Sequence, residues 1–301
     1  MATGPPASSR KQTKLSLTGD FSGFSVEVKP GGTAVITFTR PERLNGLTPG
    51  LKRDLVEWLA LAELDDSVRV IVFTGSGRAF SAGDDISDSA DSPDRQNPTL
   101  VRPRPGADGQ PIRTYGLLRL FNQEVPRVIR ALDKITIAAI NGVAIQSGLT
   151  LALACDFRFA AESARLGSAT LRMGYLPDEG GHWLLVQHMG LAKALDFVLR
   201  HRIVPAAEAL DLGLVNEVCA DATVLSRSLE LARELGSGPQ VAMRLAKRAL
   251  YQAYDLTFEQ AGEDIAVRAA LSDYHADARE GREAFLEKRP ASFNQWLESS
   301  E

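Results

Sequence analysis

Two short turns built from small residues are the parts of this 301-residue chain that could do chemistry with the main chain alone. The first, residues 79–86, follows a β-branched run at 69–73, and the second, residues 141–150, follows another at 135–140. Small residues let a ligand approach main-chain N–H groups closely. The second turn leads into a predicted helix, whose first N–H groups lack partners. Together the turns could direct two N–H donors at one carbonyl oxygen, which is an oxyanion hole for negative charge that develops on oxygen.

A pair of neighbouring carboxylates could supply the proton-transfer group. Asp178 is the first candidate for the acid/base and Glu179 is the second. Tyr175, Leu176 and Trp183 lie close to Asp178 in sequence, and apolar neighbours of this kind exclude water, as acid/base sites require. In the alternative interpretation, Asp178 caps a helix that starts near residue 180, since acidic residues favour helix N-termini.

The elements that must position these residues alternate between strands and helices in the first half of the chain. Strands are predicted at 25–29 and 33–39, on either side of a Pro-Gly-Gly turn. Residues 48–64 predict a helix with Thr48 as N-cap and Pro49 at its first position. A further helix at 118–132 should bend or break at its proline, residue 126. This alternation favours an α/β core. The second half reads as helices at 191–200, 206–212, 222–235, 240–254, 258–272 and 276–288.

These patterns divide the chain into three parts. Residues 1–18 are expected to form a disordered polar tail, residues 19–220 the α/β core, and residues 221–301 a helical C-terminal region. That last region either caps a site and builds a subunit interface or forms a helical layer of the same domain. Residues 87–114 are Pro-rich and aperiodic, so they predict a flexible insertion, either a surface loop or a lid over a substrate pocket.

Composition excludes several classes of function. The net charge of −4 gives no reason to expect nucleic-acid or membrane binding, and no apolar run is long enough to span a bilayer. Cys155 and Cys219 stand alone, and the four histidines show no metal-ligand spacing, so neither a metal site nor a disulfide framework is predicted. A reducing cytoplasm is therefore the expected location.

Five ordered segments resemble the crotonase (enoyl-CoA hydratase/isomerase) superfamily over roughly residues 24–295. The segments are 40–47 (Arg-Pro-x-x-x-Asn-x-Leu), 80–85 (Phe-Ser-Ala-Gly-Asp-Asp), 155–160 (Cys-Asp-x-x-x-Ala), 174–181 (Gly-x-x-Pro-x-x-Gly-Gly) and 207–215 (Ala-Glu-Ala-Leu-Asp-Leu-Gly-Leu-Val, similar to the family's Ala-x-x-Ala-x-x-x-Gly-Leu-Val helix). Their order along one chain makes coincidence an unsatisfactory explanation. The resemblance implies a crotonase-like α/β fold of repeated ββα units with a helical C-terminal region, assembled as a homotrimer or homohexamer.

The resemblance also implies roles for individual residues. The N–H groups of Asp84 and Ser147 would form the oxyanion hole, although the family usually has glycine where this chain has Ser147. The substrate would be an acyl-CoA thioester, with coenzyme A as part of the substrate and no metal or redox cofactor. Besides Asp84 and Ser147, the positions expected to bind it are Arg40, Arg43, Ala82, Ile86, Phe285 and Lys288. Alternatively, the two arginines and Lys288 are solvated surface residues and Phe285 packs in the core.

One departure from the family changes the expected chemistry. Hydratases of the family use two glutamates, and the matching positions here are Thr150 and Thr170. A threonine hydroxyl cannot act as a general base without an activating partner. A double-bond shift needs one carboxylate, so the first hypothesis is an enoyl-CoA isomerase that uses Asp178. The alternatives are a hydratase that uses Asp178 and Glu179, and a non-catalytic acyl-CoA-binding or scaffold member.

Overall fold

A computed structural model of the chain describes residues 16–85 and 111–300. Residues 1–15 of the predicted tail and most of the predicted insertion at 87–114 lie outside the described residues. The last residues of that segment begin helix α3 (Pro111–Leu117), which continues into a π-helical turn, Leu118–Asn122. The helix predicted at 118–132 is therefore interrupted before Pro126. That proline lies in the first turn of α4 (Glu124–Ala131), where its missing N–H would have no helical partner in any case.

The larger of two sheets has seven strands in the spatial order β1-β2-β3-β4-β6-β8-β11. The pairs β1–β2 and β2–β3 are antiparallel, and the pairs from β3 through β11 are parallel. The strands are β1 (Gly19–Phe21), β2 (Phe24–Lys29), β3 (Thr33–Phe38), β4 (Val70–Gly75), β6 (Ile135–Ile140), β8 (Phe157–Ala161) and β11 (Glu217–Cys219). Every residue of β6 is buried, as expected of a parallel strand that is covered on both faces.

A smaller sheet of four strands stands beside the larger one, in the order β10-β9-β7-β5. Its strands are β5 (Ala79–Ser81), β7 (Val143–Ile145), β9 (Arg165–Gly167) and β10 (Ile203–Pro205). Three times the chain leaves a strand of the large sheet (β4, β6, β8) and immediately adds a strand to the small one (β5, β7, β9). Helix α5 (Ser147–Ala154) follows β7, and α6 (Gly181–Met189) comes after β9. The predicted architecture of repeated ββα units is confirmed.

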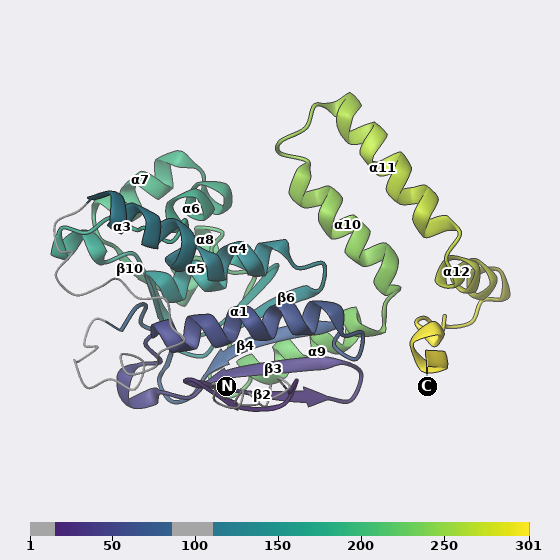
Figure 1. The fold of residues 1–301 in the computed structure, drawn as a ribbon, viewed down its shortest axis with the longest axis horizontal. Coiled ribbons are helices and arrows are strands. Elements are labelled where there is room, and N and C mark those ends of the chain that lie inside the picture. Colours follow the sequence, from purple (N-terminus) through teal and green to yellow (C-terminus); the bar gives the residue numbers. More distant parts are fainter. Residues whose placement is uncertain (1–15, 86–110, 301) are drawn as a thin grey trace, which may run out of the picture.

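Helices cover both faces of the large sheet. In Figure 1, α1 (Pro49–Leu64) crosses the front of the sheet and α9 (Val224–Ser237) lies behind it, in contact with β3, β4, β6 and β8. The Thr48 hydroxyl accepts a hydrogen bond from the N–H of Leu51 (3.2 Å), and Pro49 is the first helical residue, as predicted. The remaining core helices are α7 (Leu191–Leu199) and α8 (Ala206–Asp211).

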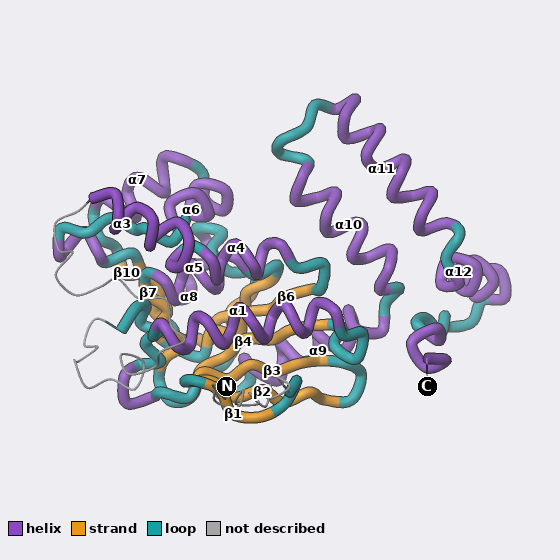
Figure 2. Tube along the Cα trace, in the orientation of Figure 1, coloured by secondary structure: helices purple, strands orange, loops and turns teal. Residues whose placement is uncertain are grey.

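The last helices extend away from the α/β core, as Figures 1 and 2 show. They are α10 (Gln240–Gln252), α11 (Phe258–Asp273) and α12 (Ala276–Glu287). Several large apolar side chains on and between them are exposed in the single chain, among them Tyr254 (78%), Phe258 (89%), Tyr274 (91%) and Phe285 (83%). Within the described residues, no helix combines the length and apolarity that crossing a membrane requires.

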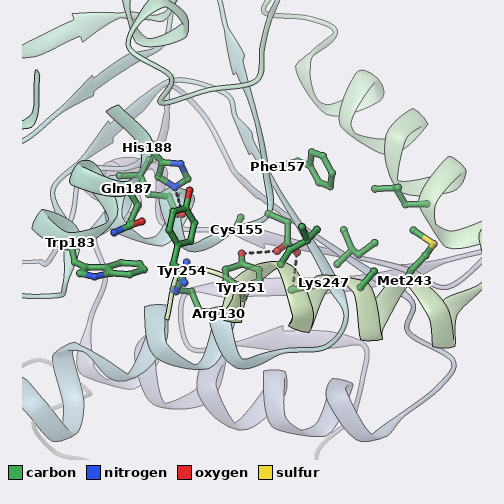
Figure 3. Close-up of a pocket in the computed structure, with 16 residues that line it drawn as sticks. Arg130, Cys155, Phe157, Trp183, Gln187, His188, Met243, Lys247, Tyr251 and Tyr254 are labelled. Atoms are coloured by element: carbon green, nitrogen blue, oxygen red, sulfur yellow. Dashed lines mark hydrogen bonds and ion pairs between the residues drawn. The ribbon is translucent and has the colours of Figure 1, made fainter. Parts of the chain in front are cut away.

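A buried carboxylate fastens α10 to the core. Asp156 accepts hydrogen bonds from the Thr136 N–H (2.7 Å), the Tyr251 hydroxyl (2.7 Å) and the Lys247 ammonium (2.8 Å). The Asp156 and Lys247 side chains are only 11% and 7% exposed. Figure 3 labels the two α10 residues, Lys247 and Tyr251, and draws their interactions with this carboxylate as dashed lines.

Asp156→Ala is expected to lower the free energy of unfolding by about 3–5 kcal/mol, because it leaves the Lys247 ammonium buried without its counter-charge. Urea denaturation followed by circular dichroism measures the change. Asp264→Ala, which breaks an i,i+4 pair with Arg268 on α11, is the control and should cost about 1 kcal/mol or less. Equal losses in the two variants would contradict this assignment.

Candidate active site

A cavity of about 830 Å³ lies at the carboxyl ends of β5 and β7. Carboxyl ends of neighbouring parallel strands are where α/β proteins usually bind ligands. Both turns singled out from the sequence line the cavity, and the carboxylate segment 178–179 closes it. Its lining includes Arg43, Ala82, Asp84, Ile145, Gln146, Ser147, Thr170, Met173, Tyr175, Leu176, Asp178 and Glu179.

Two main-chain N–H groups at this cavity have no hydrogen-bond partner within the described residues. Leu47 donates to the carbonyl of Gly83 (2.8 Å) and accepts from the N–H of Asp85 (3.1 Å), so this parallel bridge leaves the N–H of Asp84 pointing away from Leu47. Ser147 is the first residue of α5, where an N–H has no partner inside the helix. The structure thus places both of these N–H groups, which the sequence singled out, at one cavity.

Glycines bring the two turns into contact. A Cβ on Gly148 would lie 2.2 Å from the carbonyl oxygen of Ser81, and a Cβ on Gly83 would lie 3.4 Å from the nitrogen of Ser147. Asn45 fixes the adjoining loop, because its buried amide donates to the carbonyls of Ser76 (3.0 Å) and Ala79 (2.7 Å). The asparagine of the 40–47 motif thus has a structural role.

The side chain of Asp84 forms an ion pair with a lysine that sequence reasoning missed. Lys52 lies 2.8 Å from the Asp84 carboxylate, and its side chain is only 5% exposed. The sequence feature that could have indicated this ion pair is a lysine on the apolar face of α1, next to Leu51. Because Asp84 is held in this ion pair, we do not count its carboxylate as the acid/base.

Glu179 is the carboxyl group of the cavity whose environment is most altered. It is 4% exposed, and it accepts a hydrogen bond from the Ser147 hydroxyl. Burial raises the pKa of Glu179 to about 7, and the charges of Asp84 and Asp178 raise it as well, whereas the bond from Ser147 opposes them. A carboxyl group with a pKa near 7 can both accept and return a proton at neutral pH. Asp178 is less buried, and its main-chain carbonyl accepts a bond from Gln123 (2.9 Å).

Ser147→Ala is expected to move the pKa of Glu179 above about 7, because it removes the hydrogen bond that favours the ionised carboxylate. The Glu179 signal would be followed by carboxyl ¹³C NMR as a function of pH. Ser228→Ala removes a buried hydroxyl on α9 that donates to the carbonyl of Val224, and it should leave this titration unchanged. A wild-type midpoint near the ordinary value of 4.5 would show the inferred environment to be wrong.

The two threonines at the family's glutamate positions lie differently. Thr150 is buried under the start of α6, so that a Cβ on Gly181 would lie 2.4 Å from its hydroxyl oxygen, and it does not line the main cavity. Thr170 does line the cavity, and its hydroxyl is buried without a hydrogen-bond partner within the described part of the chain.

The predicted coenzyme A contacts are only partly brought together. Arg43 and Ala82 line the cavity, and Ile86 lies outside the described residues. Arg40 does not line it, because its guanidinium bonds to the carbonyl of Gly46 (2.7 Å) and to Asp85 (2.8 Å). Phe285, on α12, and Lys288, which ends that helix, do not line the cavity in the single chain.

A second cavity, of about 480 Å³, separates α10 from the core (Figure 3). The Arg130 guanidinium lies over the rings of Trp183 (4.7 Å) and Tyr251 (4.4 Å) at this cavity. His188 bonds to the carbonyl of Leu153 (3.1 Å), and burial lowers the pKa of this imidazole to about 4. No residue predicted to act in catalysis or binding lines this second cavity within the described part of the chain.

The fold is an α/β fold of ββα units, and two main-chain N–H groups without partners within the described residues lie at one cavity beside strands β5 and β7. Comparisons with known proteins identify the family to which this arrangement belongs. The Enoyl-CoA hydratase/isomerase family model matches residues 29–103 and 106–296. The chain is 35% identical to 1,2-epoxyphenylacetyl-CoA isomerase of Escherichia coli over 87% of its own length and 95% of that protein. It is 32% identical to crotonyl-CoA hydratase of Syntrophomonas wolfei over 86% of its length and 94% of that enzyme.

The fold comparison agrees. An enoyl-CoA hydratase subunit of Geobacillus kaustophilus superposes with a TM-score of 0.80 at 30% identity, covering 92% of this chain and 99% of the other. The chain belongs to the enoyl-CoA hydratase/isomerase family and is an enzyme of that family.

Proposed function

We propose that the enzyme shifts a carbon–carbon double bond in an acyl-CoA thioester. In this proposal the thioester oxygen accepts hydrogen bonds from the N–H groups of Asp84 and Ser147. Asp178 and Glu179 act together as the acid/base that moves one proton between two carbons of the acyl group.

The observation that carries the proposal is the one-sided placement of the available carboxyl groups. Asp178 and Glu179 are adjacent in the chain and close the cavity from one segment. Among the other carboxyl groups that line the cavity, Asp84 is paired with Lys52 and Asp85 with Arg40. Glu42 is exposed, and Thr150 lies under the start of α6 and does not line the cavity. Addition of water to a double bond usually requires a general base and a general acid at separate positions. A double-bond shift requires one group that removes a proton and returns it to another carbon. The arrangement therefore favours isomerisation.

The reaction balances without any further reactant. The carboxylate removes a proton from the carbon next to the thioester, and the electron pair moves onto the thioester oxygen as an enolate. The two N–H donors stabilise that negative charge. The same carboxyl group then returns the proton at the far end of the conjugated system, the oxygen regains its double bond, and the carbon–carbon double bond has moved. No metal or redox cofactor is needed for these steps, and coenzyme A stays attached.

Trans-3-hexenoyl-CoA and trans-2-hexenoyl-CoA, incubated separately with the enzyme in ²H₂O, test the reaction. We expect interconversion without change of mass apart from deuterium exchanged at the reacting carbons. Gain of one water would instead establish the hydratase alternative, which relatives named as hydratases support. Binding without turnover of any enoyl-CoA would identify a non-catalytic member of the family.

The C-terminal helices suggest that copies of the chain associate. Phe285 is 83% exposed and, with Lys288, lies away from the cavity of its own chain, so these residues could approach coenzyme A only in a neighbouring copy. We propose a homotrimer or a dimer of trimers. Light scattering after size-exclusion chromatography should give three or six times the 32.5 kDa chain mass, and a monomer would contradict the proposal.

A further inference from the structure

Gln146, immediately before the donor Ser147, adopts a backbone conformation that favours glycine. Its φ is 48° and its ψ is −114°, and side chains other than glycine rarely occur there. The surrounding chain holds this conformation in place. The Gln146 N–H donates to the carbonyl of Gly167 (3.0 Å), and its carbonyl accepts from the N–H of Thr150 (2.8 Å). A glycine would satisfy the same bonds without strain, so the glutamine side chain needs another explanation.

The side chain of Gln146 is placed and oriented inside the active-site cavity. It is 8% exposed, and it lines both the 830 Å³ cavity and a narrow recess behind it. Its amide oxygen accepts a hydrogen bond from the buried hydroxyl of Ser168 (3.3 Å). This bond leaves the amide –NH₂ group without a hydrogen-bond partner within the described part of the chain.

Apolar side chains form part of the walls of both spaces that Gln146 lines, beside the carboxyl groups and hydroxyls already described. Ile145, Met173 and Leu176 line the cavity, and Leu149, Pro177 and Leu185 line the recess. A hydrocarbon acyl chain that filled this space would bury the –NH₂ donor without an acceptor, which is costly. An acyl chain with an oxygen at this point would satisfy the donor. Sites built to hydrogen-bond a substrate group discriminate strongly against analogues that lack it.

We propose that Gln146 determines specificity: its amide –NH₂ donates to an oxygen on the acyl group, and the preferred substrates are acyl-CoA thioesters with a hydrogen-bond-accepting oxygen near the thioester. This rests on the proposed function only in that the cavity must bind acyl-CoA. It does not depend on which reaction follows.

Saturated acyl-CoA pairs of matched size test the proposal by binding alone. 3-Hydroxybutanoyl-CoA is compared with 3-methylbutanoyl-CoA, and 4-hydroxybutanoyl-CoA with pentanoyl-CoA, by isothermal titration calorimetry. The wild-type enzyme should bind the hydroxylated member of at least one pair about tenfold more tightly, as expected of one buried hydrogen bond. Gln146→Met keeps the volume but removes the donor, and it should reduce that ratio to about one.

Two further variants keep the result interpretable. Gln146→Gly suits the local backbone, so it should fold even where Gln146→Met does not, and it should lose the same preference. Gln187→Met, at the second cavity in Figure 3, should keep the wild-type ratio. A wild-type ratio near one in both pairs, or a preference that persists in both Gln146 variants, would overturn the assignment. Failure of every acyl-CoA to bind would instead overturn the proposed function itself.

Discussion

Glu179→Gln and Asp178→Asn should each lower kcat for the double-bond shift by about 10²–10⁴-fold, the range that general acid–base catalysis usually contributes. Each amide keeps the shape of the carboxyl group but cannot take or return a proton. The two carboxyl groups are adjacent, and the charge of Asp178 raises the pKa of Glu179, so they should act as one unit. The double variant is therefore expected to be no slower than the slower single variant, because effects within a unit are not additive.

The pH dependence of kcat/KM tests the assignment of Glu179 as the acid/base independently. Glu179 must be ionised to remove a proton, and its pKa is raised to about 7, so kcat/KM should rise with pH until about 7 and then level off. In Glu179→Gln this limb should disappear, while binding of saturated acyl-CoA should persist. Asp264→Asn, on α11 and away from the cavity, is the control for a neutralised acid. Wild-type turnover in both single variants would refute the assignment of the acid/base, and multiplied losses in the double variant would refute the shared unit.

Much of the fold was predictable because its signals are local. The N-cap Thr48 and the following Pro49 marked the start of α1, and the apolar, β-branched run at 135–140 has the observed bounds of β6. The four strands of the small sheet were missed. Each has three residues, too few to show an alternating pattern, and their partners are distant in sequence, as Val143 is from Arg165.

For the candidate site too, features with a local sequence signal were predictable and contacts between distant residues were not. The two turns that carry the N–H groups of Asp84 and Ser147 were predictable because small residues after a strand mark a turn whose main chain a ligand can approach. The Lys52–Asp84 pair and the hydrogen bond from Ser147 to Glu179 were not, because each joins residues 32 positions apart. These contacts change the interpretation of the carboxylates. Asp84 is held in an ion pair with Lys52, and Glu179, the second candidate from sequence, is the buried group with a pKa near 7.

Gly148→Ala should lower kcat by about 10²–10³-fold, the usual cost of losing one oxyanion-hole donor. The added Cβ would lie 2.2 Å from the carbonyl oxygen of Ser81, so α5 and β5 must move apart. That movement displaces the Ser147 N–H, which α5 carries, from the Asp84 N–H, which follows β5. The loss should fall on kcat rather than on KM, because the donors bind the enolate more strongly than the ground-state carbonyl.

Such an overlap also destabilises the fold, by about 1–3 kcal/mol, so the comparison needs a variant with the same steric fault elsewhere. A Cβ on Gly142 would lie 2.2 Å from the carbonyl oxygen of Arg78, and Gly142 does not line the cavity. Gly142→Ala should lose similar stability in urea denaturation but much less kcat. Gly262→Ala, on α11 with no atom within 4 Å of the added Cβ, should leave kcat unchanged. If Gly142→Ala and Gly148→Ala lose kcat equally, the loss reflects general destabilisation, and the N–H of Ser147 is not the donor that holds the enolate.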